Sequence, residues 1–340
     1  MSKETLAWLN TNVLVGFTDK RGRAWHYRAS GQGVEPNHYP GPIPVDDVLR
    51  RLFYWDAVKG TATATFVANE GVTTVEDTKR FPVGRADTGA VFGYFADGYE
   101  IHQYRDWLVT NIANILDSDR ELGIGSAGLL KNGAQAWVQV EVPDNIRTPE
   151  GVEFRPSLIA CTSLDGSLAT TYKRTVTAVI CDNTLAAGLG EHGQQFKVKH
   201  SRYSKFRITE ARDALAVIHT AADEFAAEVT ALCDTTVTDR TWSAFLDAHT
   251  PLPEQPGRAR TFAERQREAL TRLWNTDERV APWRNTAYGV LAAVNTYTHH
   301  ESTVRGTSRP ERNISRAITG GIDALDHDTL ATLSTVLDAQ

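Results

Sequence analysis

The central third of the chain contains the pattern that most restricts what it can fold into. Residues 136–142 alternate between small apolar side chains and Trp137, Gln139 and Glu141, the period of two expected of a half-buried strand. Two further β-rich segments, 157–164 and 167–180, flank the Asp165-Gly166 pair, which is typical of tight hairpin turns. We therefore predict three consecutive antiparallel strands.

A short helix is expected after the third strand. Asp182 or Asn183 is suited to cap its N-terminus, and Gly188 or Gly190 to end it. The sequence thus predicts an α+β fold, in which an antiparallel sheet with a central β-β-β-α unit is followed by a mainly helical C-terminal third. That third begins with a long amphipathic helix over 209–233, and Thr261 and Glu264 form a capping box for the next helix. Further helices are expected over 283–300 and 328–339.

The N-terminal region mixes strands and helices. Strands are expected at 11–17 and 61–68, helices at 45–58 and 105–118, and a hairpin around Asp97-Gly98 within 90–104. We divide the chain into an N-terminal α+β region (1–125), a central core (126–235) and a helical C-terminal region (236–340). One compact domain is the alternative.

Composition restricts the possible partners. The net charge is −6, so no global attraction draws this chain to nucleic acid or to an anionic membrane, and any polyanion contact must come from a local patch. Three cysteines without a CxxC pair argue against a disulfide framework and a zinc ribbon. No segment approaches about 18 uninterrupted apolar residues. We expect a soluble protein of the host-cell cytoplasm with no membrane partner.

Three motifs suggest chemistry that the residues around them do not support. The glycines of GIGSAG, residues 123–128, match a dinucleotide-binding pattern, but a helix precedes them and a strand follows, the reverse of what that site needs, so we interpret them as a flexible turn. His299 and His300 are adjacent and do not share a helix face, which favours a solvated helix end over a metal site. Cys181 is interpreted as a buried strand residue before a helix cap. We expect no metal and no cofactor.

The segment FKVKHSRYSKFRI, residues 196–208, is the strongest functional signal. It is basic and aromatic, and no acidic residue occurs from His192 to Thr209. On a strand, Lys197 and Lys199 would point outward together, about 6 to 7 Å apart, a spacing similar to that of successive phosphates on a single strand. A cationic groove with aromatic side chains is how sequence-tolerant single-strand binders work. The alternative is a basic edge that protects a strand from pairing with another chain.

Several long motifs in order resemble one family. They include WLNTNVLVGFTDKRGRAWHYRA, NHYPGPIPVDDVLRRLF, DTGAVFGYFADGYEIHQY, GIGSAGLLKNGAQAWVQVEVPD and GVEFRPSLIACTSLDGSLATTYKRTVTAVICDNTLAAGL. Together with NTAYGVLAAVNTYTHHES they are similar to the phage- and plasmid-borne family of the domain of unknown function 932, over roughly residues 6 to 300. This resemblance implies a mobile element of actinobacterial type, and no chemistry. The central topology is also similar in plan to phage single-strand annealing proteins of the RecT, Red-beta and Erf group.

The leading hypothesis is a phage-encoded, non-enzymatic, homo-oligomeric protein, forming a ring or filament, that binds single-stranded DNA and promotes annealing in recombination. The predicted nucleic-acid-binding residues are Lys173, Arg174, Lys197, Lys199, Arg202, Tyr203, Lys205, Phe206 and Arg207. One alternative is a metal-dependent hydrolase or nuclease acting on nucleic acid or nucleotides, built from His102, Asp182, Asn183, His192 and His200. A second is an inhibitor that binds a host protein.

Overall fold

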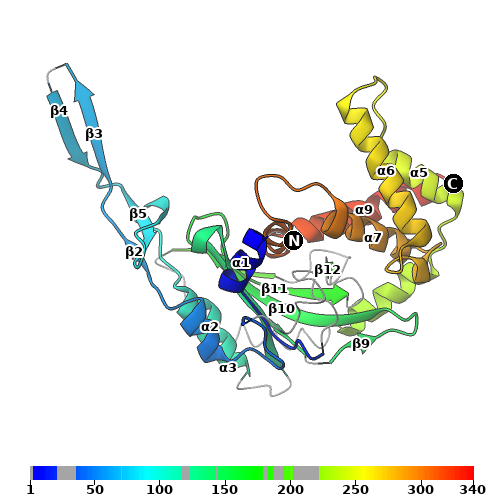
Figure 1. Cartoon of the computed structure of the whole chain (residues 1–340), viewed down its shortest axis with the longest axis horizontal. Coiled ribbons are helices and arrows are strands. Elements are labelled where there is room, and N and C mark those ends of the chain that lie inside the picture. The colour runs from blue at the N-terminus through cyan, green and yellow to red at the C-terminus, as the bar shows by residue number, and fades with distance from the viewer. Residues whose placement is uncertain are drawn as a thin grey trace.

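The largest sheet is antiparallel and lies at the centre of the fold (Figure 1). The computed structural model describes residues 3–20, 36–69, 71–116, 122–142, 144–178, 183–186, 195–201 and 222–340, without the side chains of 3–6, 114–115, 174, 177–178, 183–186 and 195–196. Among these residues the strand order is β1 (Val13–Val15), β7 (Gly123–Leu130), β8 (Gln135–Glu141), β10 (Glu153–Ser163), β11 (Thr170–Ala178) and β12 (Asn183–Ala186). Strand β9 (Ile146–Arg147) pairs with β10, and β13 (Gln195–Val198) pairs with β11.

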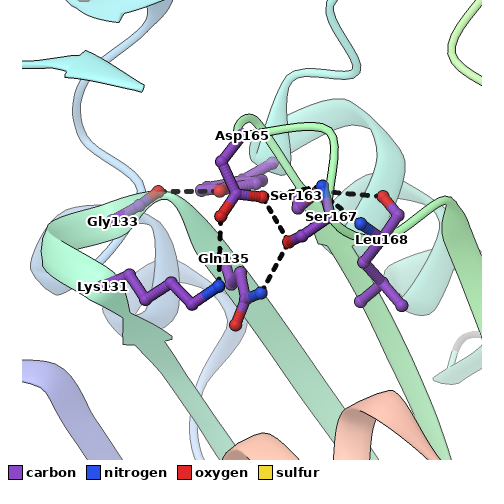
Figure 2. A network of polar contacts seen from close by, with 8 residues as sticks. Lys131, Gly133, Gln135, Ser163, Asp165, Ser167 and Leu168 are labelled. Atoms are coloured by element: carbon purple, nitrogen blue, oxygen red, sulfur yellow. Dashed lines mark hydrogen bonds and ion pairs between the residues drawn. The ribbon is translucent and has the colours of Figure 1, made fainter. Parts of the chain in front are cut away.

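The predicted turn at Asp165-Gly166 is confirmed. Gly166 has a φ of +74°, and β10 pairs with β11 in register from Phe154 opposite Ala178 to Cys161 opposite Thr171. Figure 2 shows how polar contacts hold this turn: the Asp165 carboxylate accepts from the Ser167 amide at 2.9 Å and from the Lys131 ammonium at 3.3 Å. The Gln135 side-chain amide donates to the Ser167 hydroxyl at 2.7 Å, and this hydrogen bond links the turn to the neighbouring strand β8.

Two predictions about the central sheet are wrong. Strand β8 is buried on both faces, not half-buried, because helices cover the sheet on each side. Residues 123–128 form part of strand β7 and not a flexible turn. A side chain at Gly128 would lie 2.2 Å from the Trp137 ring and 2.6 Å from the Asn12 carbonyl oxygen, so this glycine is needed for close packing.

Two local expectations that depended on turn residues also fail. Residues 183–186 pair with β11 as strand β12, so no helix begins at Asn183, and the β-β-β-α unit continues as further strands. Strand β6 (Val91–Ala96) pairs with the preceding β5 (Arg80–Arg85), so there is no hairpin around Asp97-Gly98. In both places the segment pairs with the strand that precedes it in the sequence, and this pairing replaces the cap or turn that we predicted.

Different helices cover the two faces of the sheet. On one face lie α2 (Val45–Arg51), shorter than predicted, and a continuous helical segment made of η2 (Arg105–Thr110) and α3 (Asn111–Leu116). On the other, α1 (Lys3–Asn12) and α8 (Arg309–Thr319) pack with Trp137 and Ile159, through residues such as Leu9 and Ile314. This second face also holds α9 (Gly321–Asp338) near β11. The sheet therefore joins the first and last parts of the chain.

The C-terminal third is helical, as predicted, which makes the protein an α+β fold. Before α8 and α9 come a helix over 222–234, α5 (Asp239–His249), α6 (Arg258–Thr276), η4 (Ala281–Trp283), α7 (Ala287–Thr296) and η5 (Tyr297–Glu301).

Two predictions about these helices are wrong. There is no capping box at Thr261, because α6 begins after Gly257 and the Thr261 hydroxyl donates to the Gly257 carbonyl oxygen at 3.2 Å. His299 is buried, contrary to the expected solvated helix end. No helix among the described residues has the length and apolar character needed to span a membrane.

A ribbon of two strands extends from the body of the molecule (Figure 1, upper left). Its base is β2 (Ala57–Lys59) paired with β5, and its outer part is β3 (Thr63–Ala68) paired with β4 (Gly71–Glu76). We call residues 63–76 the arm. All described residues of the arm are exposed.

Candidate functional site

Five aromatic rings form a continuous stack beside the hairpin of β10 and β11. The order is Phe95, Tyr99, His200, His102 and Trp107, with successive centroid distances of 3.9, 5.1, 4.0 and 3.6 Å and interplanar angles of 20° or less. Phe95 lies near the end of strand β6, Trp107 lies in η2, and His200 follows β13. Segments far apart in the sequence therefore meet at one place.

Two threonines on the sheet orient the stacked histidines. The Thr170 hydroxyl lies 2.7 Å from His102 Nδ1, and the Thr162 hydroxyl lies 3.0 Å from His200 Nε2. The two hydroxyls are 2.8 Å apart, so they link the two rings through one hydrogen-bonded group. Thr162 and Thr170 come from adjacent strands at the turn end of the hairpin, which is why its register decides this geometry.

Both histidines are held neutral near pH 7. Burial, with a smaller contribution from the charge of a protonated His200, lowers the pKa of His102 to about 3. Burial likewise lowers the pKa of His200 to about 4. His102 Nε2 is buried and makes no hydrogen bond within the described part of the chain. The site therefore offers neutral imidazole nitrogens and hydroxyl groups, not positive charge.

Part of the predicted hydrolase set converges here. His102 and His200 stack, while Asn183 lies on β12 with its side chain outside the described atoms. Asp182 and His192 lie outside the described residues, as does Cys181. Among the residues that the structure describes, no group of three or more His, Cys, Asp or Glu side chains has the arrangement of a metal site.

The strand expected at the start of the basic segment is present as β13. Lys197 and Lys199 are both exposed. Lys197 is paired opposite Thr171, which is itself opposite Cys161, so these three side chains lie on the same face of the sheet. Cys161 Sγ lies 3.6 Å from the Ile318 carbonyl oxygen of α8. Lys197 therefore points to the face that α8 covers.

Lys173 does not suit the phosphate contact predicted for it. Its side chain is 5% exposed, and its ammonium lies 3.1 Å from the Asp323 carboxylate of α9. A buried lysine paired with a carboxylate joins the sheet to the helix and offers no charge to solvent. The Arg174 side chain and residues Arg202, Tyr203, Lys205, Phe206 and Arg207 lie outside what the structure describes.

The sequence reasoning missed a group of arginines on α8. Arg309, Arg312 and Arg316 follow one another at spacings of three and four residues, which places them on one side of the helix. All three are partly exposed. This spacing was visible in SRPERNISR and could have identified the group.

The surroundings of these arginines are cationic. Burial lowers the pKa of Arg312 to about 10, with contributions from the charges of Arg309 and Arg316. The negative charge of Glu301 raises the pKa of Arg309, against the effect of burial. The ion pair of Glu301 is with a different arginine, Arg272, at 2.5 Å. In the described part of the chain, none of the three arginines forms an ion pair with a carboxylate. Arg309 and Arg312 also donate to the carbonyl oxygens of His299 and Thr298, so these two side chains join α8 to η5.

Comparison with known proteins identifies a family and no function. A family model described as a domain of unknown function (DUF932) matches residues 91–319, more than half of the chain. No curated protein and no solved structure matches. The matched range contains the ring stack, strand β13 and helix α8. This chain belongs to the DUF932 family.

Proposed function

We propose that this protein binds single-stranded DNA and promotes annealing of complementary strands in phage recombination, without catalysing a reaction. The observation that supports this best is the shared face of the sheet on which Lys197 and the helix α8 lie. Lys197 of β13 and Lys199 just after it are more than 100 residues from the arginines of α8. Cations on the edge of the sheet and on the outer side of the helix that covers this face are an arrangement that can follow a phosphate backbone.

The electrostatics of Cys161 support this placement. Burial raises the pKa of its thiol to about 12, while the positive charges of Lys173 and Lys197 oppose that increase. The charge of Lys197 therefore acts on Cys161, which contacts the end of α8. Lys173 is neutralised by Asp323, so Lys197 and Lys199 are the exposed lysines of this sheet edge that we assign to DNA.

Salt dependence of binding tests the proposal. We expect a labelled single-stranded oligonucleotide to bind with an affinity that falls as salt rises, with a log-log slope of about −0.7 for each phosphate contact. Lys197→Ala with Lys199→Ala should make the slope shallower by about 1.4, because two contacts are lost. The matched control is Arg240→Ala with Arg265→Ala, which removes the same charge from exposed positions on α5 and α6.

The same titration decides whether α8 belongs to the interface. Replacing Arg309 and Arg316 with alanine should also make the slope shallower, while circular dichroism stays that of the unchanged protein. The parent protein should accelerate annealing of two complementary strands, and the variants with weaker binding should do so less. Salt-independent binding, or equal slopes for the lysine variant and its control, would refute the proposal.

A metal-dependent nuclease is the second candidate, and the convergence of His102 and His200 favours it. Incubation of single- and double-stranded DNA with Mg²⁺ or Mn²⁺ tests this function directly. Cleavage that is lost in His102→Phe but kept in His327→Phe, a substitution of an exposed histidine, would support the nuclease. Intact DNA with both metals would refute it.

A further inference from the structure

The arm has the properties of a protein–protein contact element. Four of its large apolar side chains are more than half exposed: Phe66 (61%), Val67 (80%), Val72 (67%) and Val75 (51%). Val67 is paired opposite Val72, so these two share one face, while Phe66 and Val75 lie on the other. Each face of the arm therefore exposes two large apolar side chains.

The edges of the arm are also open. Strands β3 and β4 pair only with each other among the described residues, and their sequences, TATFVA and GVTTVE, contain a single charged residue, Glu76. Exposed edge strands are usually protected by charges, prolines or bulges, and these strands have none of these along almost their whole length. A two-stranded hairpin is marginally stable in water by itself, so a partner is expected to complete it.

The chain also carries a matching open edge. Strand β6, with the uncharged sequence VFGYFA, pairs only with β5 among the described residues, and Val91 and Tyr94 are 55% and 60% exposed. Tyr94 is opposite Pro82 of β5. Pro82 has no N–H to donate, and its carbonyl oxygen accepts from the Gly60 amide on the side of β5 away from β6, so Pro82 makes no backbone hydrogen bond to Tyr94. The backbone groups of Tyr94 therefore point to the open edge, ready to pair with another strand.

We propose that the arm of one copy of this chain adds to the β6 edge of a second copy. The two elements are matched in length, since both have strands of six residues, roughly 20 Å, and pairing them buries almost no charge. Nucleic acid is a poor occupant because the arm strands contain no cation. The arm extends away from the rest of its own chain, which is the position from which a neighbour is reached (Figure 1).

This contact joins two different surfaces, so its repetition links copies head to tail. Such an interface generates a closed ring or an open filament, depending on the rotation between neighbours. The inference does not depend on DNA binding, because it uses only the arm and strand β6. Its failure would leave the salt-dependence test unaffected.

Analytical ultracentrifugation of the full-length protein tests the proposal. We expect assemblies of several copies for the parent protein at micromolar concentration. An arm variant, Phe66→Lys with Val67→Lys, and an edge variant, Val91→Lys with Tyr94→Lys, should each sediment as single chains. All four positions are exposed, so the fold is not expected to change. The matched control lies outside both elements: Phe262→Lys, on helix α6 and 43% exposed, should assemble like the parent.

Mixing the two variants gives the sharpest result. The arm variant keeps an intact β6 edge and the edge variant keeps an intact arm, so an equimolar mixture should form a one-to-one pair that grows no further. A parent protein that sediments as a single chain, single variants that still assemble, or a mixture that stays unpaired would each overturn the proposal.

Discussion

At the scale of single residues, His102 links stability to pH. Its pKa is lowered to about 3 by burial, while in the unfolded chain it is about 6.5. Because the unfolded state binds the proton more tightly, the contribution of the neutral ring is complete above pH 6.5 and is lost as the pH falls toward 3. Between pH 7.5 and pH 5 this one residue accounts for about 2 kcal/mol of the free energy of unfolding.

Urea unfolding at the two pH values measures this contribution. His102→Phe keeps a ring in the stack but cannot be protonated, so its loss of stability from pH 7.5 to pH 5 should be smaller than that of the parent by about 2 kcal/mol. The control is His327→Phe, because His327 is exposed and should leave the difference unchanged. Equal pH dependence in the parent and His102→Phe would show that His102 is not held neutral by the fold.

At the scale of elements, Gly128 tests why β7 is rich in glycine. An alanine there would place its methyl group against the Trp137 ring and the Asn12 carbonyl oxygen. Overpacking of this kind costs about 1 to 3 kcal/mol. Gly98→Ala is the matched control, since nothing lies within 4 Å of the added carbon, and its effect should stay within about 0.5 kcal/mol. Equal midpoints of thermal unfolding for the two variants would contradict the packing role.

The same strand shows what the sequence could and could not predict. Alternation and the Asp165-Gly166 turn correctly predicted β8, β10 and β11, because these signals are local. The predictions for the glycines of β7 and for the Asn183 cap were wrong, because these segments pair with the neighbouring strands β8 and β11, and turn or cap patterns do not show that pairing. The site divides between local and tertiary signals. The exposure of Lys197 and Lys199 agrees with local alternation. The pairing of Lys173 with Asp323 and the stacking of His102 on His200 depend on tertiary contacts.

At the scale of the whole molecule, the helical third is packed against the sheet through a shared apolar cluster. Phe154 of β10 meets Phe225 with ring centroids 4.7 Å apart, and the cluster also contains Trp283 and Tyr288. The Trp283 indole donates to the Glu150 carbonyl oxygen at 3.1 Å. We therefore expect the sheet and the C-terminal helices to unfold as one cooperative unit.

Phe154→Ala tests this cooperativity. Removing a fully buried phenylalanine costs about 3 to 5 kcal/mol, and in a single unit that loss is shared by every element. Native-state hydrogen exchange should then show the same decrease in opening free energy for the most protected amides of β8 and of α7. Phe262→Ala, at an exposed position on α6 outside the arm and strand β6, should change neither. If α7 kept its protection while β8 lost it, the helices would be a separately stable unit that rests on the sheet, and the cluster around Phe154 would be an interface between domains and not a shared core.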